Sequence, residues 1–432
     1  MAVTSFLAVS LGVAIPAEAS PKIKHWQLDN GVRVYFVEAR EIPMVQLRVV
    51  FDAAGARDPK DKSGLAKLTN GMLNEGAGGL STDEIATRLE ELGAELGASS
   101  GRDMATVDLR SLTDPALLEP ALDVFQKIIS APSFPEKNFE RERGRALVAL
   151  AQENQSPAAV AQKVFMRAIY GDHPYALDPS GDEASLKRLT RADVVEHYRR
   201  YYVGRNALLV IVGDLGEAQA RRVAEKTVGA LPAGEAAAPL PAPGLSASQK
   251  KEVSFPSSQS HVMMGHPGIV RSDPDFFPLY VGNYILGGGG LVSRLSNDVR
   301  EKRGLSYNVY SDVVPLRVPG PFVVGLQTRN AQREEATTIA RATLEGFRRE
   351  GPTDAELQAA KKNITGGFPL RLDSNRKITE QVATIAYYGL PLDYLEEFPL
   401  RVQTVTAQQI RDAFTRRIDP DRMVTVIVGG AP

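Results

Sequence analysis

The stretch that decides how this chain folds runs Gly287-Gly-Gly-Gly-Leu-Val-Ser-Arg-Leu-Ser-Asn-Asp-Val-Arg300-Glu-Lys-Arg-Gly304-Leu-Ser-Tyr307. Its four glycines follow an apolar helical run, residues 279–286, and predict the end of that helix, because glycine loses the most backbone entropy when it is held in a helix. A short amphipathic turn then carries Arg300, Gly304 ends it, and Tyr307 opens a stretch with the composition of a strand. Arg300 and Tyr307 are therefore predicted to flank one short helix-to-strand connection.

An arginine and a tyrosine held close together can bind peptide carbonyls, since both side chains donate hydrogen bonds in fixed directions. The plain alternative is a surface arginine and a half-buried strand tyrosine. The order Gly-Gly-Gly, Ser-Arg-Leu, Val299-Arg300 and Gly-Leu-Ser-Tyr307 resembles the second-domain signature of the pitrilysin and mitochondrial-processing-peptidase family of inverzincins. That resemblance implies that Arg300 and Tyr307 hold the substrate backbone at a zinc site across the molecule and help to stabilise the tetrahedral intermediate.

The pattern of the first half of the chain returns in the second half at an offset of 216 residues, as from Thr190 to Thr406. The other matched pairs are Val194 and Ile410, Tyr198 and Phe414, Leu208 and Val424, Val210 and Val426, Ile211 and Ile427, Val212 and Val428, and Gly213 and Gly429. A helix and the strand after it thus recur in register, which indicates a duplicated domain. The resemblance covers nearly the whole mature chain, and the family is built from such paired homologous domains.

We therefore predict an α+β protein of two homologous domains, each a mostly antiparallel sheet with helices on one face. The domains are expected at 20–230 and 250–432. Between them, residues 231–249 are rich in Pro, Ala and Gly without periodicity, which predicts a semi-extended linker. Within the first domain we expect strands at 26–37 (a hairpin turning at Asn30-Gly31), 44–51, 93–111 (a pair) and 207–212, and helices at 63–76, 82–92, 114–130, 135–155 and 190–201.

The same resemblance implies a zinc motif, H-x-x-E-H, on the first helix, with a third ligand on a later one. In this chain the two His positions hold Lys67 and Gly71, the base position holds Asn70, and the third-ligand position holds Ala149, although Glu142 is present nearby. A catalytic zinc needs about three protein ligands that are neutral or anionic. A lysine cation and two side chains without donor atoms cannot supply them. We therefore expect a degenerate zinc site, with no metal or other cofactor in this chain.

The remaining chemistry-bearing residues offer no substitute. None of the five histidines forms an i, i+4 pair; His197 is expected at the surface beside Glu196, and His173 is expected to satisfy backbone groups in a loop. Nucleophile-elbow, phosphate-loop and dinucleotide patterns are absent from the sequence. A net charge of −1 argues against a nucleic-acid surface, and the absence of cysteine excludes disulfides and thiolate ligands.

The beginning of the chain predicts secretion. An apolar core at residues 6–16 precedes Ala17-Glu18-Ala19, a small-x-small cleavage pattern, so residues 1–19 are expected to be a signal peptide and the protein periplasmic. No basic residue precedes the core, which a start codon placed too far downstream would explain; a buried N-terminal strand is the alternative. Later residues contain no apolar run of about 18, so no membrane span is predicted.

Three functions are compatible with these features. The first is a non-catalytic subunit of a heterodimeric zinc metalloendopeptidase, in which a homologous partner bearing H-x-x-E-H holds the zinc and this chain supplies Arg300 and Tyr307 to the peptide substrate. The second is a catalytically silent scaffold or peptide-binding protein, since relatives without a zinc site serve as core subunits of respiratory complexes. The third is an independent peptidase with an atypical site. Retention of the Arg300–Tyr307 spacing favours the first.

Overall fold

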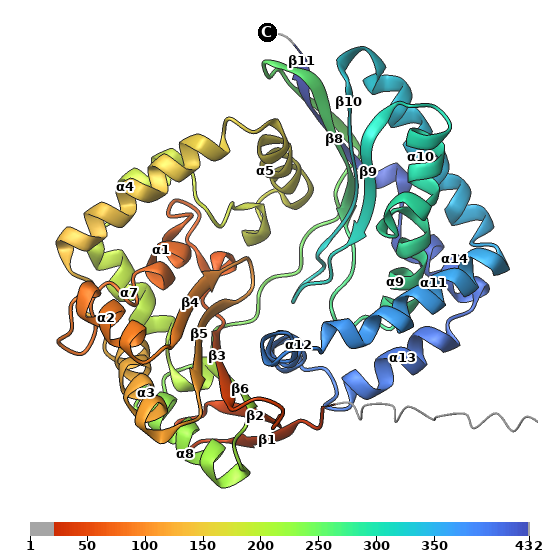
Figure 1. Ribbon diagram of the computed structural model, residues 1–432. Coiled ribbons are helices and arrows are strands. Elements are labelled where there is room, and N and C mark those ends of the chain that lie inside the picture. Colours follow the sequence, from red (N-terminus) through yellow and green to blue (C-terminus); the bar gives the residue numbers. More distant parts are fainter. Residues whose placement is uncertain (1–20, 431–432) are drawn as a thin grey trace, which may run out of the picture.

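Two β-sheets, one in each half of the chain, form the framework of the protein (Figure 1). The computed structural model describes residues 21–430, so the predicted signal peptide at 1–19 lies outside the described residues. The strands of the first sheet are β1 (Lys24–Gln27), β2 (Arg33–Glu38), β3 (Met44–Phe51), β4 (Glu95–Ser100), β5 (Ala105–Leu112) and β6 (Ala207–Gly213). The strands of the second sheet are β7 (Gln249–Val253), β8 (Ser257–Pro267), β9 (Ser306–Val313), β10 (Pro321–Arg329) and β11 (Val424–Gly430).

The two sheets share one topology. The first has the order β1-β2-β6-β3-β5-β4 and the second β7-β11-β8-β10-β9, so that β2 to β6 correspond in place to β7 to β11 once β1 is set aside. In each sheet one pair is parallel, β2 with β6 and β7 with β11, and the other pairs are antiparallel. The predicted α+β class, with two homologous domains and mostly antiparallel sheets, is confirmed.

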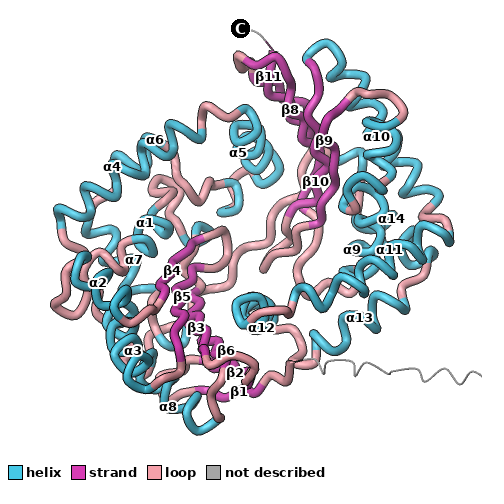
Figure 2. Tube along the Cα trace, in the orientation of Figure 1, coloured by secondary structure: helices cyan, strands magenta, loops and turns pink. Residues whose placement is uncertain are grey.

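Helices cover the outer face of each sheet (Figure 2). The helices of the first half are α1 (Leu65–Gly71), α2 (Thr82–Glu91), α3 (Pro115–Ser130), α4 (Glu136–Glu153), α5 (Pro157–Tyr170), α6 (Glu183–Arg188), α7 (Arg191–Tyr201) and α8 (Glu217–Val228). The helices of the second half are α9 (Phe276–Asn283), α10 (Arg333–Glu350), α11 (Asp354–Gly367), α12 (Asn375–Tyr388), α13 (Tyr394–Thr404) and α14 (Ala407–Arg417). The repeated threonines Thr190 and Thr406 each cap their helix, α7 and α14, with a capping box.

Each half sends one helix to the opposite sheet. Helix α12 packs on β3 and β6 of the first sheet, and α5 packs on β8 and β11 of the second (Figure 1). Strand β6 is therefore covered on both faces, because Val210 contacts the core that contains α12 while Ile211 contacts the core under the outer helices. This explains why β6 is apolar at nearly every position. Helices on one face were predicted; the exchanged helix on the other face was not, and α5 itself was missed.

None of the helices within residues 21–430 combines the length and the hydropathy that crossing a bilayer requires. The segment between α8 and β7 contains no helix or strand and lies against the first half. Its backbone carbonyls at Ala238 and Pro241 contact Arg57 Nη1 at 2.7 Å and His173 Nε2 at 2.9 Å. These bonds fix the middle of the linker to the first domain, while the Ser246 hydroxyl near its end donates to the Arg422 carbonyl of the second half at 2.9 Å.

Candidate functional site

Helix α1, expected to bear the zinc motif, is intact but presents no metal-binding side chain. Buried Asp58 caps its N-terminus, accepting the backbone N–H groups of Gly64 and Ala66 at 2.8 Å each, while burial raises the pKa of that carboxyl to about 7. Lys67 is exposed and donates to a serine hydroxyl at 3.0 Å. Gly71 faces open space, since nothing lies within 4 Å of where a Cβ would stand.

Asn70, which we expected at the position of the catalytic base, lies in the core of the domain. Its side chain is 1% exposed, and its amide nitrogen donates to the Tyr202 hydroxyl at 3.2 Å and to the Thr106 carbonyl at 3.4 Å. Burial raises the pKa of Tyr202 well above its ordinary value, so the phenol stays neutral, and its ring packs against Phe51 at 4.5 Å. Asn70 therefore serves packing and hydrogen bonding inside the domain, where no water or substrate reaches it.

The acids near these positions are already occupied. Glu142 of α4 pairs with Arg145 at 2.6 Å and with Arg141, and buried Glu75 also pairs with Arg141. Ala149 lies exposed on the same helix. Across residues 21–430, no group of three or more His, Asp or Glu side chains is arranged to hold a metal ion.

One histidine prediction is wrong. His197 is 4% exposed rather than at the surface, and its Nε2 contacts the Ala53 carbonyl at 3.1 Å. Burial lowers its pKa to about 4, so the ring is neutral in the folded protein. His173 does bond to backbone as expected: its Nδ1 accepts the Tyr175 N–H at 3.0 Å, and its Nε2 contacts the linker.

The structure brings Arg300 and Tyr307 together. Arg300 lies in a π-helical turn, Ser296–Glu301, which is followed by Gly304 in the left-handed region at φ +61°. The Arg300 guanidinium carbon is 5.3 Å from the centroid of the Tyr307 ring, within the range of a cation–π contact. Its Nε atom lies 3.4 Å from the carboxylate of the adjacent Glu301. The predicted helix-to-strand connection thus carries both donors on one patch of surface.

A β-bulge aims Tyr307 away from the sheet. On β10, Gln327 faces Asn308 and Thr328 faces Ser306, which leaves Tyr307 as the extra residue of β9. The Ser306 hydroxyl spans the bulge by donating to the carbonyls of Asn308 and Gln327. Bulges turn a side chain out of the sheet's regular alternation. Tyr307 is accordingly 78% exposed, although it stands in a strand that the domain core holds.

The glycine run lets this connection pack closely on β9. A Cβ on Gly287 would stand 2.3 Å from the backbone nitrogen of Ser311, so no other residue fits there without displacing the strand. One turn earlier, Asn283 donates to the Ser311 carbonyl at 3.1 Å and accepts from its hydroxyl at 2.7 Å. The Arg300–Tyr307 pair therefore stands on a rigid base. The glycine run could be recognised in the sequence, whereas no comparably clear sequence pattern predicts the π-helical turns or the bulge.

Comparison with known proteins assigns the chain to a family. Residues 33–182 match the family model described as Insulinase (Peptidase family M16), and residues 188–364 match that of the Peptidase M16 inactive domain. A crystal structure of a peptidase M16 inactive domain from Pseudomonas fluorescens is 37% identical, covers 95% of this chain and 98% of its own, and superposes with a TM-score of 0.91. The chain belongs to peptidase family M16. The resemblance to pitrilysin-like peptidases is confirmed at this level.

More distant relatives carry different descriptions. A Helicobacter pylori protein described as the non-peptidase homolog YmxG is 24% identical over 97% of this chain and 96% of its own length. The Bacillus subtilis YmxG, described as an uncharacterized zinc protease, is 24% identical over 82% of this chain and 85% of its own. A protease structure from Helicobacter pylori, 20% identical with a TM-score of 0.86, covers 95% of this chain and 100% of its own and shows the same fold. Membership of the family therefore assigns no activity by itself.

Proposed function

We propose that this M16 chain is the non-catalytic subunit of a two-chain zinc metallopeptidase, located in the periplasm. The homologous partner bears H-x-x-E-H and holds the zinc, which supplies an activated water for attack on the scissile carbonyl. This chain contributes Arg300 and Tyr307: the guanidinium holds substrate carbonyls, and the phenol donates a hydrogen bond to the oxygen that becomes negative.

The observation that carries the proposal is the exposed, preorganised pair. Tyr307 is turned outward by a bulge, and Arg300 stands over its ring at 5.3 Å. An aromatic side chain that is 78% exposed adds little burial energy to folding, so stability does not account for its position. In the first half, by contrast, Lys67, Gly71 and Ala149 provide no set of zinc ligands. A chain that has these two hydrogen-bond donors but no zinc ligands of its own is suited to complete a zinc site on another chain.

The experiment co-expresses this chain with an M16 homologue that carries the zinc motif and assays peptide cleavage by the pair. In the pair, Arg300→Gln is expected to lower kcat/KM by roughly ten- to a hundredfold, because a hydrogen bond from a charged donor is worth about 1.5–3 kcal/mol. The matched control is Arg303→Gln, four residues from Tyr307, whose guanidinium already donates to the Asp298 carbonyl at 2.7 Å. Size-exclusion chromatography checks that both variants still assemble.

The second candidate is a catalytically silent scaffold or peptide-binding protein. The description of the Helicobacter pylori relative as a non-peptidase homolog favours it. Under this alternative, Arg300→Gln and Arg303→Gln leave any activity of a co-purifying M16 partner unchanged. That outcome would remove the role that we propose for the pair.

A further inference from the structure

Three arginine residues line one cavity of about 310 Å³ at the boundary between the two halves. Arg33 comes from β2, Arg271 from the loop after β8, and Arg317 from the loop after β9; the C-terminal end of α12, residues 387–389, completes the wall. We call this cavity the arginine pocket. Neither Asp nor Glu is among its lining residues. None of its lining residues belongs to the Arg300–Tyr307 site.

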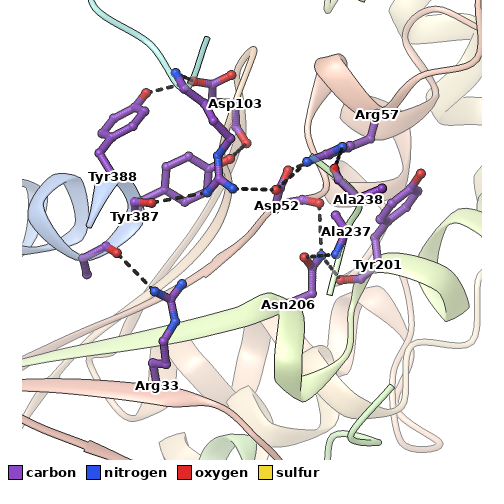
Figure 3. Close-up of polar contacts among 12 residues, drawn as sticks. Arg33, Asp52, Arg57, Asp103, Tyr201, Asn206, Ala237, Ala238, Tyr387 and Tyr388 are labelled. Atoms are coloured by element: carbon purple, nitrogen blue, oxygen red, sulfur yellow. Dashed lines mark hydrogen bonds and ion pairs between the residues drawn. The ribbon is translucent and has the colours of Figure 1, made fainter. Parts of the chain in front are cut away.

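The positive charge of the arginine pocket is only partly balanced. Among residues 21–430, Arg33 and Arg271 form no ion pair with a carboxylate. Arg317 Nη1 lies 3.2 Å from Asp52 Oδ2, but the same carboxylate also accepts two hydrogen bonds from Arg57, at 2.7 and 2.6 Å (Figure 3). Of the three pocket arginines, only Arg317 contacts a carboxylate, and it shares that carboxylate with Arg57.

Asp103, the other acid nearby, is turned to different partners. Its carboxylate accepts the Arg317 backbone N–H at 2.9 Å and the Tyr388 hydroxyl, and its carbonyl accepts the Tyr387 hydroxyl at 2.6 Å (Figure 3). The carboxylate also accepts the Tyr175 hydroxyl. It therefore fixes the walls of the cavity and makes no bond to any of the three guanidinium groups. A net positive field remains inside a partly enclosed space, where charges are screened less than at an open surface.

The guanidinium groups are held in place before any ligand arrives. Arg317 lies over the Tyr387 ring at 4.2 Å and donates to the Tyr387 carbonyl at 3.2 Å. Arg271 lies over the Phe276 ring at 4.6 Å, and Arg33 donates to a carbonyl of the last turn of α12 at 3.4 Å. The Nε atoms of Arg271 and Arg317 are buried without a hydrogen-bond partner. Carbonyls at a helix end attract cations, but Arg271 contacts none of the α12 carbonyls; its guanidinium lies against Phe276 and Tyr394 instead.

We propose that the arginine pocket is a binding site for a small oxyanion. Guanidinium forks match the geometry of carboxylate and phosphate oxygens, and fixed forks lose little entropy when they bind them. The anion would contact the outward nitrogens of Arg33, Arg271 and Arg317 and complete their charge balance. Two sources have this chemistry: a free phosphate or pyrophosphate, and the carboxyl end of a peptide. This proposal does not depend on the function proposed for Arg300 and Tyr307.

The test measures binding to the purified full chain by isothermal titration calorimetry at constant ionic strength. The probes are sodium phosphate, sodium pyrophosphate and one short peptide in two forms, with a free and with an amidated C-terminus. If the phosphates bind, the ligand is a free anion. If the free-acid peptide binds and the amidated peptide does not, the ligand is the carboxyl end of a peptide. Either result supports the proposal. Absence of binding by every probe, or equal binding of both peptide forms with none of either phosphate, would overturn it.

Variants tie any binding to the arginine pocket. Arg33→Gln and Arg271→Gln are each expected to weaken binding roughly tenfold or more. The matched control is Arg221→Gln, an arginine of α8 that also stacks on an aromatic ring, Trp26 at 4.5 Å, but lies elsewhere. If Arg271→Gln does not fold, Arg271→Lys keeps the charge without the fork and is expected to weaken binding as well. Equal affinity in the pocket variants and the control would contradict the proposal.

Discussion

The two regions in which we expected catalytic groups from the family resemblance have opposite characters. In the first half, Asn70 is buried and hydrogen-bonded to Tyr202, while Gly71 faces open space and has no side chain that could bind a metal. In the second half, Arg300 of the π-helical turn lies beside Tyr307, which a bulge in β9 exposes at the surface. The two domains share one sheet topology, but their polar side chains have different roles. Those of the first half hold the domain together, and those of the second are available to another molecule.

From this contrast between the two halves, we expect the largest effect of a substitution at Tyr307. Tyr307→Phe in the assembled pair is expected to lower kcat by roughly a hundred- to a thousandfold, as the loss of one oxyanion donor does, with little change in KM or in melting temperature. Steady-state kinetics measure it. Tyr310→Phe is the control, because that ring lies on the same strand but packs over Gly325 of β10. Equal losses in both variants would mean that the strand, and not the phenol, matters.

The second prediction restores ligands to the first half. The variant Lys67→His/Gly71→His/Ala149→Glu is expected to bind about one zinc ion, because Lys67, Gly71 and Ala149 are exposed and a side chain at Gly71 meets no neighbour. It should still cleave no peptide, since Asn70 remains in the core. Inductively coupled plasma mass spectrometry measures the metal. The two-histidine variant without Ala149→Glu is the control, and a metal content no higher than the control's would mean that the three positions do not converge.

The third prediction concerns acid stability of the first half. His197 has a pKa of about 4 when folded and 6.5 when unfolded, so below pH 6.5 the unfolded chain takes up a proton that the folded chain does not. Stability is therefore lost as pH falls from about 6.5 to 4, by about 3 kcal/mol from this group. Urea unfolding at pH 7 and pH 4.5 measures it. His197→Gln should lose less stability over that interval than the wild type; an identical loss would contradict the assignment.

The smallest effect is expected at Asn70. Asn70→Ala should cost about 1–3 kcal/mol of unfolding free energy, because it leaves the buried Tyr202 hydroxyl without its partner. Adding Tyr202→Phe should recover part of that loss, since both polar groups are then gone. Urea titration of the two variants measures the difference. If Asn70→Ala instead lowered the activity of the pair and left stability intact, the contrast between the halves would fail.

Local patterns predicted much of the fold. The strand expected at 44–51 is β3, and the hairpin expected around Asn30-Gly31 joins β1 and β2. The helix expected at 190–201 is α7, and its expected repeat is α14. These features depend on residues within a few positions of one another, so the sequence displays them directly.

Features that depend on distant partners could not be predicted in the same way. His197 has the sequence setting of a surface residue, and only the arrival of Ala53 from another element buries it. The exchange of α5 and α12 and the gathering of Arg33, Arg271 and Arg317 likewise depend on how the halves pack. The spacing of Arg300 and Tyr307 did predict their proximity, because one short connection joins them. The bulge that exposes Tyr307 depends on the register with β10 and was not foreseen.

The central claim is that this chain completes a metal site that belongs to its partner. The most direct measurement is zinc content and peptide turnover for three samples side by side: this chain, the zinc-motif homologue, and the two together. The account predicts zinc only where the homologue is present and turnover only in the mixture. Stoichiometric zinc in this chain alone, or full turnover by the homologue without it, would contradict the account.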